Sequence, residues 1–309
     1  MGRRLFTPAA IGAAFFTLLA ATPAAADHSN ANLPWPEHLP PQQVTTDAQP
    51  GPLRNCKRAR LRCVERVVAR MTRRWRALDA ACDHRAVFAL TYLRTTEAFL
   101  QTIREQRRFF RHRRWVIYED VLFAAYYFRA FDRYARGQRV PDAWRIAFEA
   151  AAGGATNAGH DVFLGMNAHI QRDLPYVLAK VGLRTREGRS RKPDHDRVNR
   201  ILTAVLDPIE DEVARRYDPF FTLADAKPSP VEELGALEML KSWREGAWRN
   251  AERLLNANSP AERREVAQSI ETWSRIWAEA IRAGQTPGYS SVRDPHCRAG
   301  HGGTVAGSG

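Results

Sequence analysis

The sequence lacks the short motifs by which the common catalytic folds are recognised. Its 309 residues contain no G-x-S-x-G, no H-E-x-x-H, no Walker loop, no G-x-G-x-x-G at the start of a βα unit and no C-x-x-C-H. These absences argue against a serine-hydrolase elbow, a zincin, a P-loop enzyme, a dinucleotide-binding fold and a c-type haem protein. A C-x-x-C pair is also missing, which argues against a zinc site built from thiolates.

Lysine is scarce, although the chain is strongly basic. The formal net charge is +13, and only five of the 47 basic residues are lysine. A preference for arginine follows as easily from a GC-rich genome as from function, so it does not predict sequence-specific binding of nucleic acid. A basic protein nevertheless favours anionic lipids, polymers or phosphate surfaces. Two arginine-rich runs, residues 107–114 and 184–191, would supply such a surface.

Long apolar runs are confined to the N-terminus. Residues 1–26 combine Arg3 and Arg4 with an apolar stretch and a small-residue A-x-A end, which predicts a secretory signal peptide cleaved near Ala26. No later run is apolar for long enough to span a bilayer. We therefore expect a secreted protein, extracellular or associated with the cell envelope.

The sequence contains only four cysteines, an even number. An exported chain with four cysteines is expected to form two disulfides, and three pairings are possible. If residues 64–80 form one helix, Cys63 and Cys82 lie about 25 Å apart, which disfavours a bond between them. The favoured pairing is Cys56 with Cys63 and Cys82 with Cys297.

Alternating strand patterns are missing as well, and most of the chain follows the 3.6-residue period of amphipathic helices. Residues 56–285 are therefore predicted to form one all-α domain of about eight helices, with bundle-like or orthogonal packing. The proline-rich residues 27–55 are predicted to be an extended arm, and residues 286–309 a flexible tail pinned near Cys297. The expected helices are 57–80, 84–108, 113–136, 141–152, 157–181, 194–216, 230–257 and 260–283.

The segment MNAHIQRDLP, residues 166–175, places two ionisable side chains on an apolar helix face. On a helical wheel His169 and Asp173 point with the apolar residues, whereas Gln171 points away. A histidine and a carboxylate one turn apart can bind one metal ion, or the carboxylate can orient the histidine as a general base. The alternatives are a structural pair in the core, or an Asp173 that stabilises a kink at Pro175.

Three further polar side chains occupy apolar faces of predicted helices. His195 follows Asp194, a good N-cap, and lies in a first turn where the helix dipole favours the neutral, metal-binding form of histidine. Glu97 and Asp120 are carboxylates that must be paired, protonated or bound to a cation on such faces. The alternatives are an ordinary histidine near a helix start, and acids paired with arginine or tyrosine.

The segments CDHRAVFALTYLRTTE, LGMNAHIQRDLP, KPDHDRVN and RRYDP together resemble a family of exported actinobacterial proteins known as a domain of unknown function. The resemblance covers most of residues 60–260, and its NAHI-x-x-DLP element is distinctive. It implies a helical fold and export, and it supplies no activity. The matching motif positions are Asn167, His169, Asp173, His195 and Asn199.

We therefore expect a metal-dependent hydrolase that cleaves phosphate or ester bonds of an anionic envelope or lipid-like substrate. Its one divalent metal would be zinc, manganese or iron. The metal ligands would be His169, Asp173 and His195. Asp120 or Glu97 would complete the metal shell or act as base, and Asn167 would orient water or substrate. The alternative function is a non-catalytic binding protein for anionic envelope polymers or lipids.

Overall fold

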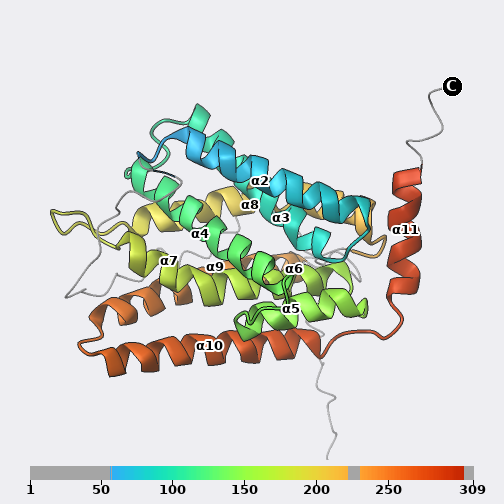
Figure 1. The fold of residues 1–309 in the computed structure, drawn as a ribbon. Coiled ribbons are helices and arrows are strands. Elements are labelled where there is room, and N and C mark those ends of the chain that lie inside the picture. Colours follow the sequence, from blue (N-terminus) through green and yellow to red (C-terminus); the bar gives the residue numbers. More distant parts are fainter. Residues whose placement is uncertain (1–55, 57, 222–229, 303–309) are drawn as a thin grey trace, which may run out of the picture.

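The computed structural model describes residues 56, 58–221 and 230–302, and every regular element in these ranges is a helix (Figure 1). β-structure in these ranges is limited to isolated bridges, one of which joins Arg184 and Ser190. The predicted all-α domain is therefore confirmed.

The helices in chain order are α2 (Leu61–Ala80), α3 (Arg85–Glu105), α4 (Arg113–Tyr134), α5 (Asp142–Gly153), α6 (Ala158–Met166), η2 (Asn167–Asp173), α7 (Leu174–Val181), α8 (Lys192–Tyr217), α9 (Pro230–Asn256), α10 (Pro260–Arg282) and α11 (Ser290–Gly302). Each predicted helix is present, and the ends agree to within a few residues. Two features differ from the prediction. The helix expected at 157–181 is interrupted by the π-helical segment η2, and α11 lies in the tail that was expected to be flexible.

The predicted signal peptide, residues 1–26, and the predicted arm, residues 27–55, lie outside the described residues. Within the described part of the chain, no helix combines the length and the apolar character needed to cross a membrane.

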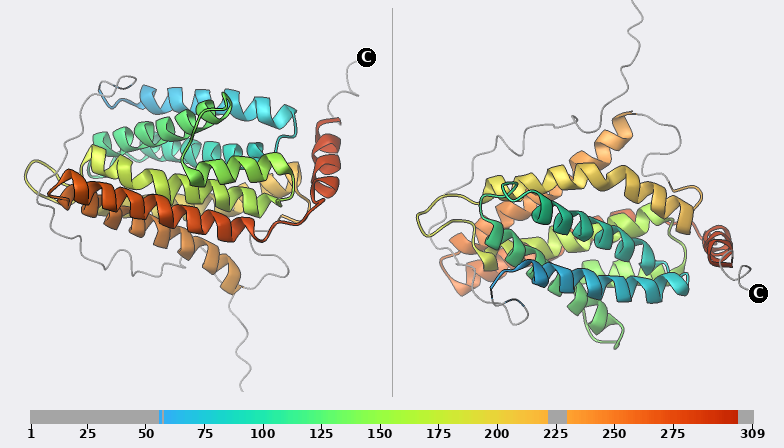
Figure 2. Two further views of the ribbon diagram at one scale, coloured as in Figure 1. Left: turned by 60° about the horizontal axis from the view of Figure 1, so that its bottom comes forward. Right: turned by 90° about the horizontal axis from the view of Figure 1, so that it is seen from above.

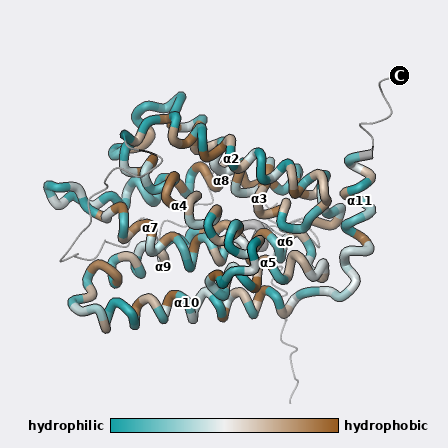
Figure 3. Tube along the Cα trace, in the orientation of Figure 1, coloured by the Kyte–Doolittle hydropathy of each residue, from teal (hydrophilic) through white to brown (hydrophobic). Residues whose placement is uncertain are grey.

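The helices form one bundle with η2 in its interior. α2 and α10 lie on opposite sides of the bundle, and α11 crosses the direction of the other helices at one end (Figure 1, Figure 2). η2 packs against α4, α5, α6, α7, α9 and α10. Polar and apolar residues alternate along the helices (Figure 3), as expected for amphipathic helices around a core. Four polar side chains of η2 are nevertheless buried, which makes their partners important: Asn167, His169, Gln171 and Asp173.

The π-helical turn explains how a proline is accommodated in this segment. Pro175 has no N–H group and cannot continue the regular ladder of helical hydrogen bonds. Just before it, the N–H of Leu174 bonds to the carbonyl of His169, five residues back, which widens the turn. The distortion expected at Pro175 is thus present, and turns of this kind are frequent at functional sites.

A disulfide and a buried arginine attach α11 to the bundle. Both predicted disulfides are confirmed: Cys56–Cys63 and Cys82–Cys297. Arg293 of α11 is buried and donates hydrogen bonds to the Asp161 carboxylate at 2.6 Å and to the Thr156 carbonyl at 2.9 Å. Cys297 thus joins the tail to the bundle at the point where the sequence analysis placed it, whereas the helix α11 around it was not predicted. Helical periodicity missed this helix because polar contacts and a disulfide, rather than a broad apolar stripe, hold it in place.

Two buried carboxylates at the ends of α8 cap the starts of other helices. Asp194 accepts hydrogen bonds from the backbone N–H groups of Arg111 and His112, at 2.8 and 2.6 Å, just before α4. Asp218 accepts one from the N–H of Ala158, at 2.9 Å, in the first turn of α6. N–H groups at or just before the first turn of a helix have no backbone acceptor within that helix, so a side-chain acceptor satisfies them. The expectation that Asp194 caps its own helix is wrong, because α8 begins before it.

Candidate functional site

A cavity of about 110 Å³ lies between α3, α4, η2, α8 and α9. Most of its lining is apolar, with Phe88 and Tyr92 from α3 and Phe123 from α4 among the walls. Asp120 and His169, both predicted site residues, line the same cavity. Several lining residues are only half-buried, so the cavity opens toward the protein surface.

Three buried polar atoms at this cavity have no hydrogen-bond partner among the described residues. They are Tyr92 Oη, Asp120 Oδ2 and His169 Nε2, and each belongs to a different helix. Buried polar atoms in folded proteins are nearly always paired, so an unpaired group requires an explanation. Three such atoms on one cavity indicate a place where a ligand or substrate would satisfy them.

His169 is held so that one ring nitrogen is available to the cavity. Its Nδ1 lies 3.3 Å from Asp173 Oδ2, and the Phe123 ring stacks on the imidazole at 3.5 Å. Asp173 also accepts hydrogen bonds from Trp144 Nε1 at 2.9 Å and from Arg172 Nη1 at 2.8 Å, so the carboxylate is fixed in position. Because a carboxylate only accepts, Nδ1 carries the proton and Nε2 keeps its lone pair. Burial lowers the pKa of His169, partly opposed by Asp173, which favours the neutral ring.

Burial raises the pKa values of both acids beside the cavity. Burial, with a smaller effect from the charge of Glu119, raises the pKa of Asp120 to about 8. Burial likewise raises the pKa of Glu119 to about 7, although the positive charge of Arg244 opposes the shift. The pKa of the Tyr92 hydroxyl is raised well above its usual value, first by burial and then by Asp120. Near pH 7, Asp120 and Tyr92 are therefore hydrogen-bond donors beside an unprotonated imidazole.

His195 lies behind the cavity wall, in a network with Arg244. The Arg244 Nη2 group donates to the His195 carbonyl at 2.7 Å and lies 3.3 Å from His195 Nδ1, while His195 Nε2 lies 3.2 Å from the Arg244 carbonyl. The Nε group of Arg244 donates to Asn199 Oδ1 at 2.7 Å. Burial, followed by the charge of Arg244, holds the pKa of His195 well below its usual range. Both ring nitrogens of His195 are engaged, and His195 positions Arg244 against the cavity.

Two other predicted site residues lie away from the cavity. Glu97 forms an ion pair with Arg94 at 2.7 Å and is more than one-third exposed, so the paired-acid alternative is the correct one. Asn167 is fully buried and donates to the Ser274 carbonyl at 2.8 Å, while its Oδ1 accepts from Gln171 at 2.8 Å. Gln171 is therefore buried too, contrary to the wheel, because the π-helical turn rotates it into the bundle. Asn167 joins η2 to α10 and does not face the cavity.

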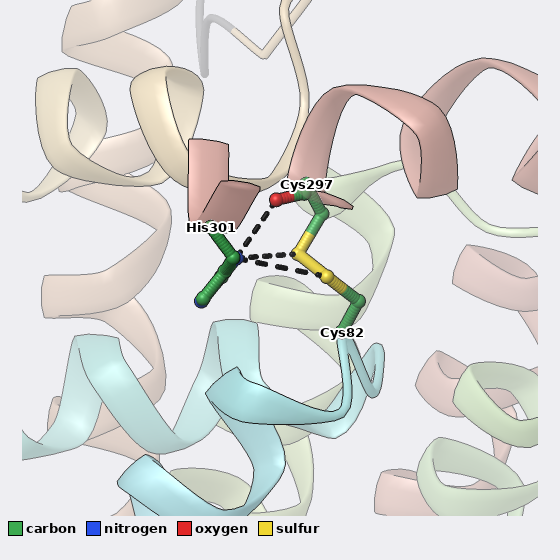
Figure 4. A group of neighbouring side chains, drawn as sticks. All are labelled: Cys82, Cys297 and His301. Carbon is green, nitrogen blue, oxygen red and sulfur yellow. Dashed lines mark hydrogen bonds between the residues drawn. A yellow bond between two sulfur atoms is a disulfide. The ribbon is translucent and has the colours of Figure 1, made fainter. Parts of the chain in front are cut away.

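The predicted metal ligands are not gathered around one point. His169 and Asp173 contact each other, whereas His195 is paired with Arg244. Within the described ranges, the one group of three potential metal-binding side chains is Cys82, Cys297 and His301 (Figure 4). Its two sulfur atoms are joined in a disulfide and offer no thiolate.

Sequence reasoning did not single out Tyr92, Glu119 or Arg244. A tyrosine on an apolar helix face is indistinguishable from an ordinary core residue until its hydroxyl is seen to be unpaired. Together with Asp120 and His169, these residues combine a neutral base, acids whose pKa values are raised, and one guanidinium in a largely apolar cavity. That combination suits general acid–base catalysis on an uncharged molecule.

Comparison with known proteins identifies a family for the chain and no activity. No curated protein and no solved structure matches the chain. The DUF5995 family, described as a family of unknown function, matches residues 64–284, from the first turn of α2 to just beyond α10. The match includes the whole cavity and both ends of η2. Because it covers well over half of the sequence, the chain belongs to the DUF5995 family.

Proposed function

We propose that this protein is an exported hydrolase that cleaves a small uncharged ester, or the ester end of a lipid-like molecule, in the cavity between α3, α4 and η2. The observation that carries the proposal is the set of three unpaired polar atoms on that cavity: Tyr92 Oη, Asp120 Oδ2 and His169 Nε2. Export is proposed from the N-terminal sequence, where residues 1–26 have the composition of a signal peptide.

In the proposed reaction, His169 Nε2 takes a proton from a water molecule as the water oxygen bonds to the ester carbonyl carbon. The protonated Asp120 and the Tyr92 hydroxyl donate hydrogen bonds to the oxygen on which negative charge develops. The bond to the leaving oxygen then breaks, and that oxygen takes the proton from the imidazolium. Asp173 holds the ring and stabilises its positive charge while it lasts. General-base catalysis of this kind is worth about 10²- to 10⁴-fold, and each oxyanion donor about 10²- to 10³-fold.

The size and charge of the cavity support a short, neutral acyl group. Its volume of about 110 Å³ is smaller than the roughly 150 Å³ of a cavity that accepts benzene. Glu119 and Asp120 ionise only around or above neutral pH because burial raises their pKa values to about 7 and about 8. An anionic phosphate would have to enter beside these two acids with only Arg244 to balance it. The cavity therefore favours the ester alternative over the phosphate alternative.

The direct test is turnover of p-nitrophenyl acetate, butyrate and octanoate by the purified protein. We expect the short acyl chains to react faster, and His169→Gln to lower kcat/KM by about 10²-fold or more. Asp120→Asn should lower kcat, and Glu97→Gln, a surface carboxylate changed in the same way, should leave the rate unchanged. The rate should also fall above about pH 8, because Asp120 then loses its proton. Turnover that survives in His169→Gln would exclude this mechanism.

A further inference from the structure

A second concave site lies on the other side of α4 from the cavity. It is a groove of about 970 Å³ formed by the start of the described chain, α2, α4 and the end of α7. Eight of its lining residues are cations, all exposed, and no lining residue is acidic. These cations, which define the basic groove, are Arg58, Arg60, Arg62, Arg66, Arg70, Arg73, Arg129 and Lys180.

The basic groove holds a larger share of the positive charge than an even spread of charged residues over the protein surface would give it. The whole chain has a formal net charge of +13, and eight of its cations line this one groove, with no acidic residue among the lining residues. At the edge of the groove, Arg70 pairs with Asp132 at 2.8 Å, which removes only part of this charge. A concave surface of one sign focuses the electrostatic potential and attracts anions.

The cations are arranged as a line. Arg62, Arg66, Arg70 and Arg73 lie within about 80° of one another on α2 at about 100° per residue, and they span about 16 Å along its axis. Arginine binds phosphate oxygens in a bidentate manner, so such a line suits an anion with repeated phosphate groups.

The basic groove and the cavity are independent sites. Asp120 and Phe123 of α4 line the cavity, whereas Val121 and Leu122, on nearly the opposite face, line the groove. A molecule in the groove would therefore not enter the cavity. Its effect would be to hold the protein on a polymer while the cavity remains accessible.

We propose that the basic groove binds a linear polymer that carries phosphate groups along a backbone without bases. Bases of a single-stranded nucleic acid need free aromatic rings on which to stack. The one aromatic residue that lines the groove is Phe128, and the Arg70 guanidinium already covers its ring at 4.3 Å. A bilayer surface is met by a flat or convex face with exposed apolar side chains, whereas the groove is concave. None of the exposed large apolar side chains of the described residues lines the groove: Trp273 and Ile276 belong to α10, on the opposite side of the bundle from α2, Phe220 follows α8, and Val292 lies in α11.

The experiment measures binding of short-chain linear inorganic polyphosphate by fluorescence anisotropy across a salt series. The groove variant combines Arg62→Gln, Arg66→Gln and Arg73→Gln. The matched control combines Arg107→Gln, Arg108→Gln and Arg111→Gln. These three arginines are exposed and lie between α3 and α4, so their replacement removes the same charge outside the groove. Thermal unfolding followed by circular dichroism establishes that both variants are folded.

We expect the groove variant to bind about tenfold more weakly or worse, and the slope of log affinity against log salt to fall by about two, because three phosphate contacts are lost at about 0.7 each. The control should change less than twofold. Equal weakening in both variants would show diffuse surface attraction and overturn the proposal. Oligothymidylate or anionic vesicles that bind as tightly as polyphosphate, or free orthophosphate that competes equally well, would also overturn it. Ester turnover by the groove variant is measured separately, so the two proposals can fail independently.

Discussion

The Asp120 carboxyl should make stability and activity respond in opposite directions. Burial raises its pKa in the folded protein to about 8 from a usual value of 3.8. Between these two pH values the folded state keeps a proton that the unfolded state has lost, so the free energy of unfolding falls as the pH rises through this window. One bound proton corresponds to about 1.4 kcal/mol per pH unit. From pH 5 to pH 8 the ionisable carboxyl therefore costs roughly 3 to 4 kcal/mol.

Asp120→Asn keeps the shape of the protonated acid and cannot ionise. The variant should therefore gain stability over the wild type as the pH rises: the difference between their free energies of unfolding should grow by roughly 3 to 4 kcal/mol from pH 5 to pH 8. Ester turnover by the variant should fall. Urea denaturation followed by circular dichroism at the two pH values measures the change. Glu97→Gln is the control, because Glu97 is paired with Arg94 at the surface. The reasoning would be refuted if the difference in free energy of unfolding between wild type and variant stayed constant with pH, or if the variant were less stable than the wild type at pH 8.

Three further outcomes are expected. Gly165→Ala should lower the free energy of unfolding by about 1 to 3 kcal/mol, because a Cβ would lie 2.3 Å from ring atoms of Phe88; unchanged stability in a urea melt would contradict this contact. Elemental analysis of the purified protein should find no metal that depends on His169, because His195 is engaged by Arg244 and does not reach the His169–Asp173 pair; stoichiometric zinc, manganese or iron that is lost in His169→Ala would restore the metal hypothesis and refute the proposed role of His169 as base. Replacing Cys82 and Cys297 together by serine should cost about 5 kcal/mol in the chain-entropy model, since 215 residues separate them; a loss below about 1 kcal/mol would show that contacts such as those of Arg293 hold α11 by themselves.

The bundle could be predicted from the sequence because most of its helices have one apolar face, and a 3.6-residue period records that face directly. The 3.6-residue period does not reveal a helix that is attached to the bundle by polar contacts. α11 is held by Arg293 and by a disulfide, and neither contact produces a repeating pattern of apolar residues in the sequence. The π-helical turn of η2 was also invisible, because a proline predicts a disturbance but not its form. These two misses are local, and they leave the fold class unchanged.

The candidate site could be predicted only in part. A helical wheel gives the direction of a side chain but not its partner on another helix. His169 and Asp120 were found because a titratable group on an apolar face needs a special environment, and both line the cavity. His195 satisfied the same criterion and Asn167 was chosen from the motif, yet their polar atoms are engaged by Arg244 and Ser274. Which buried polar group is satisfied and which is left open depends on packing between helices, and no single-helix pattern contains that information.

The two carboxylates at the ends of α8 also bear on how the chain folds. Asp194 accepts hydrogen bonds from two N–H groups at the start of α4, which precede it by 83 and 82 residues. Asp218 accepts one at the start of α6, which precedes it by 60 residues. Neither of these helix starts has its buried acceptor until α8 is docked. Contacts of such long sequence separation slow folding, because the chain must be closed into a loop before they form. They also make unfolding cooperative, since the departure of α8 uncaps two other helices at once, including the helix that separates the cavity from the basic groove.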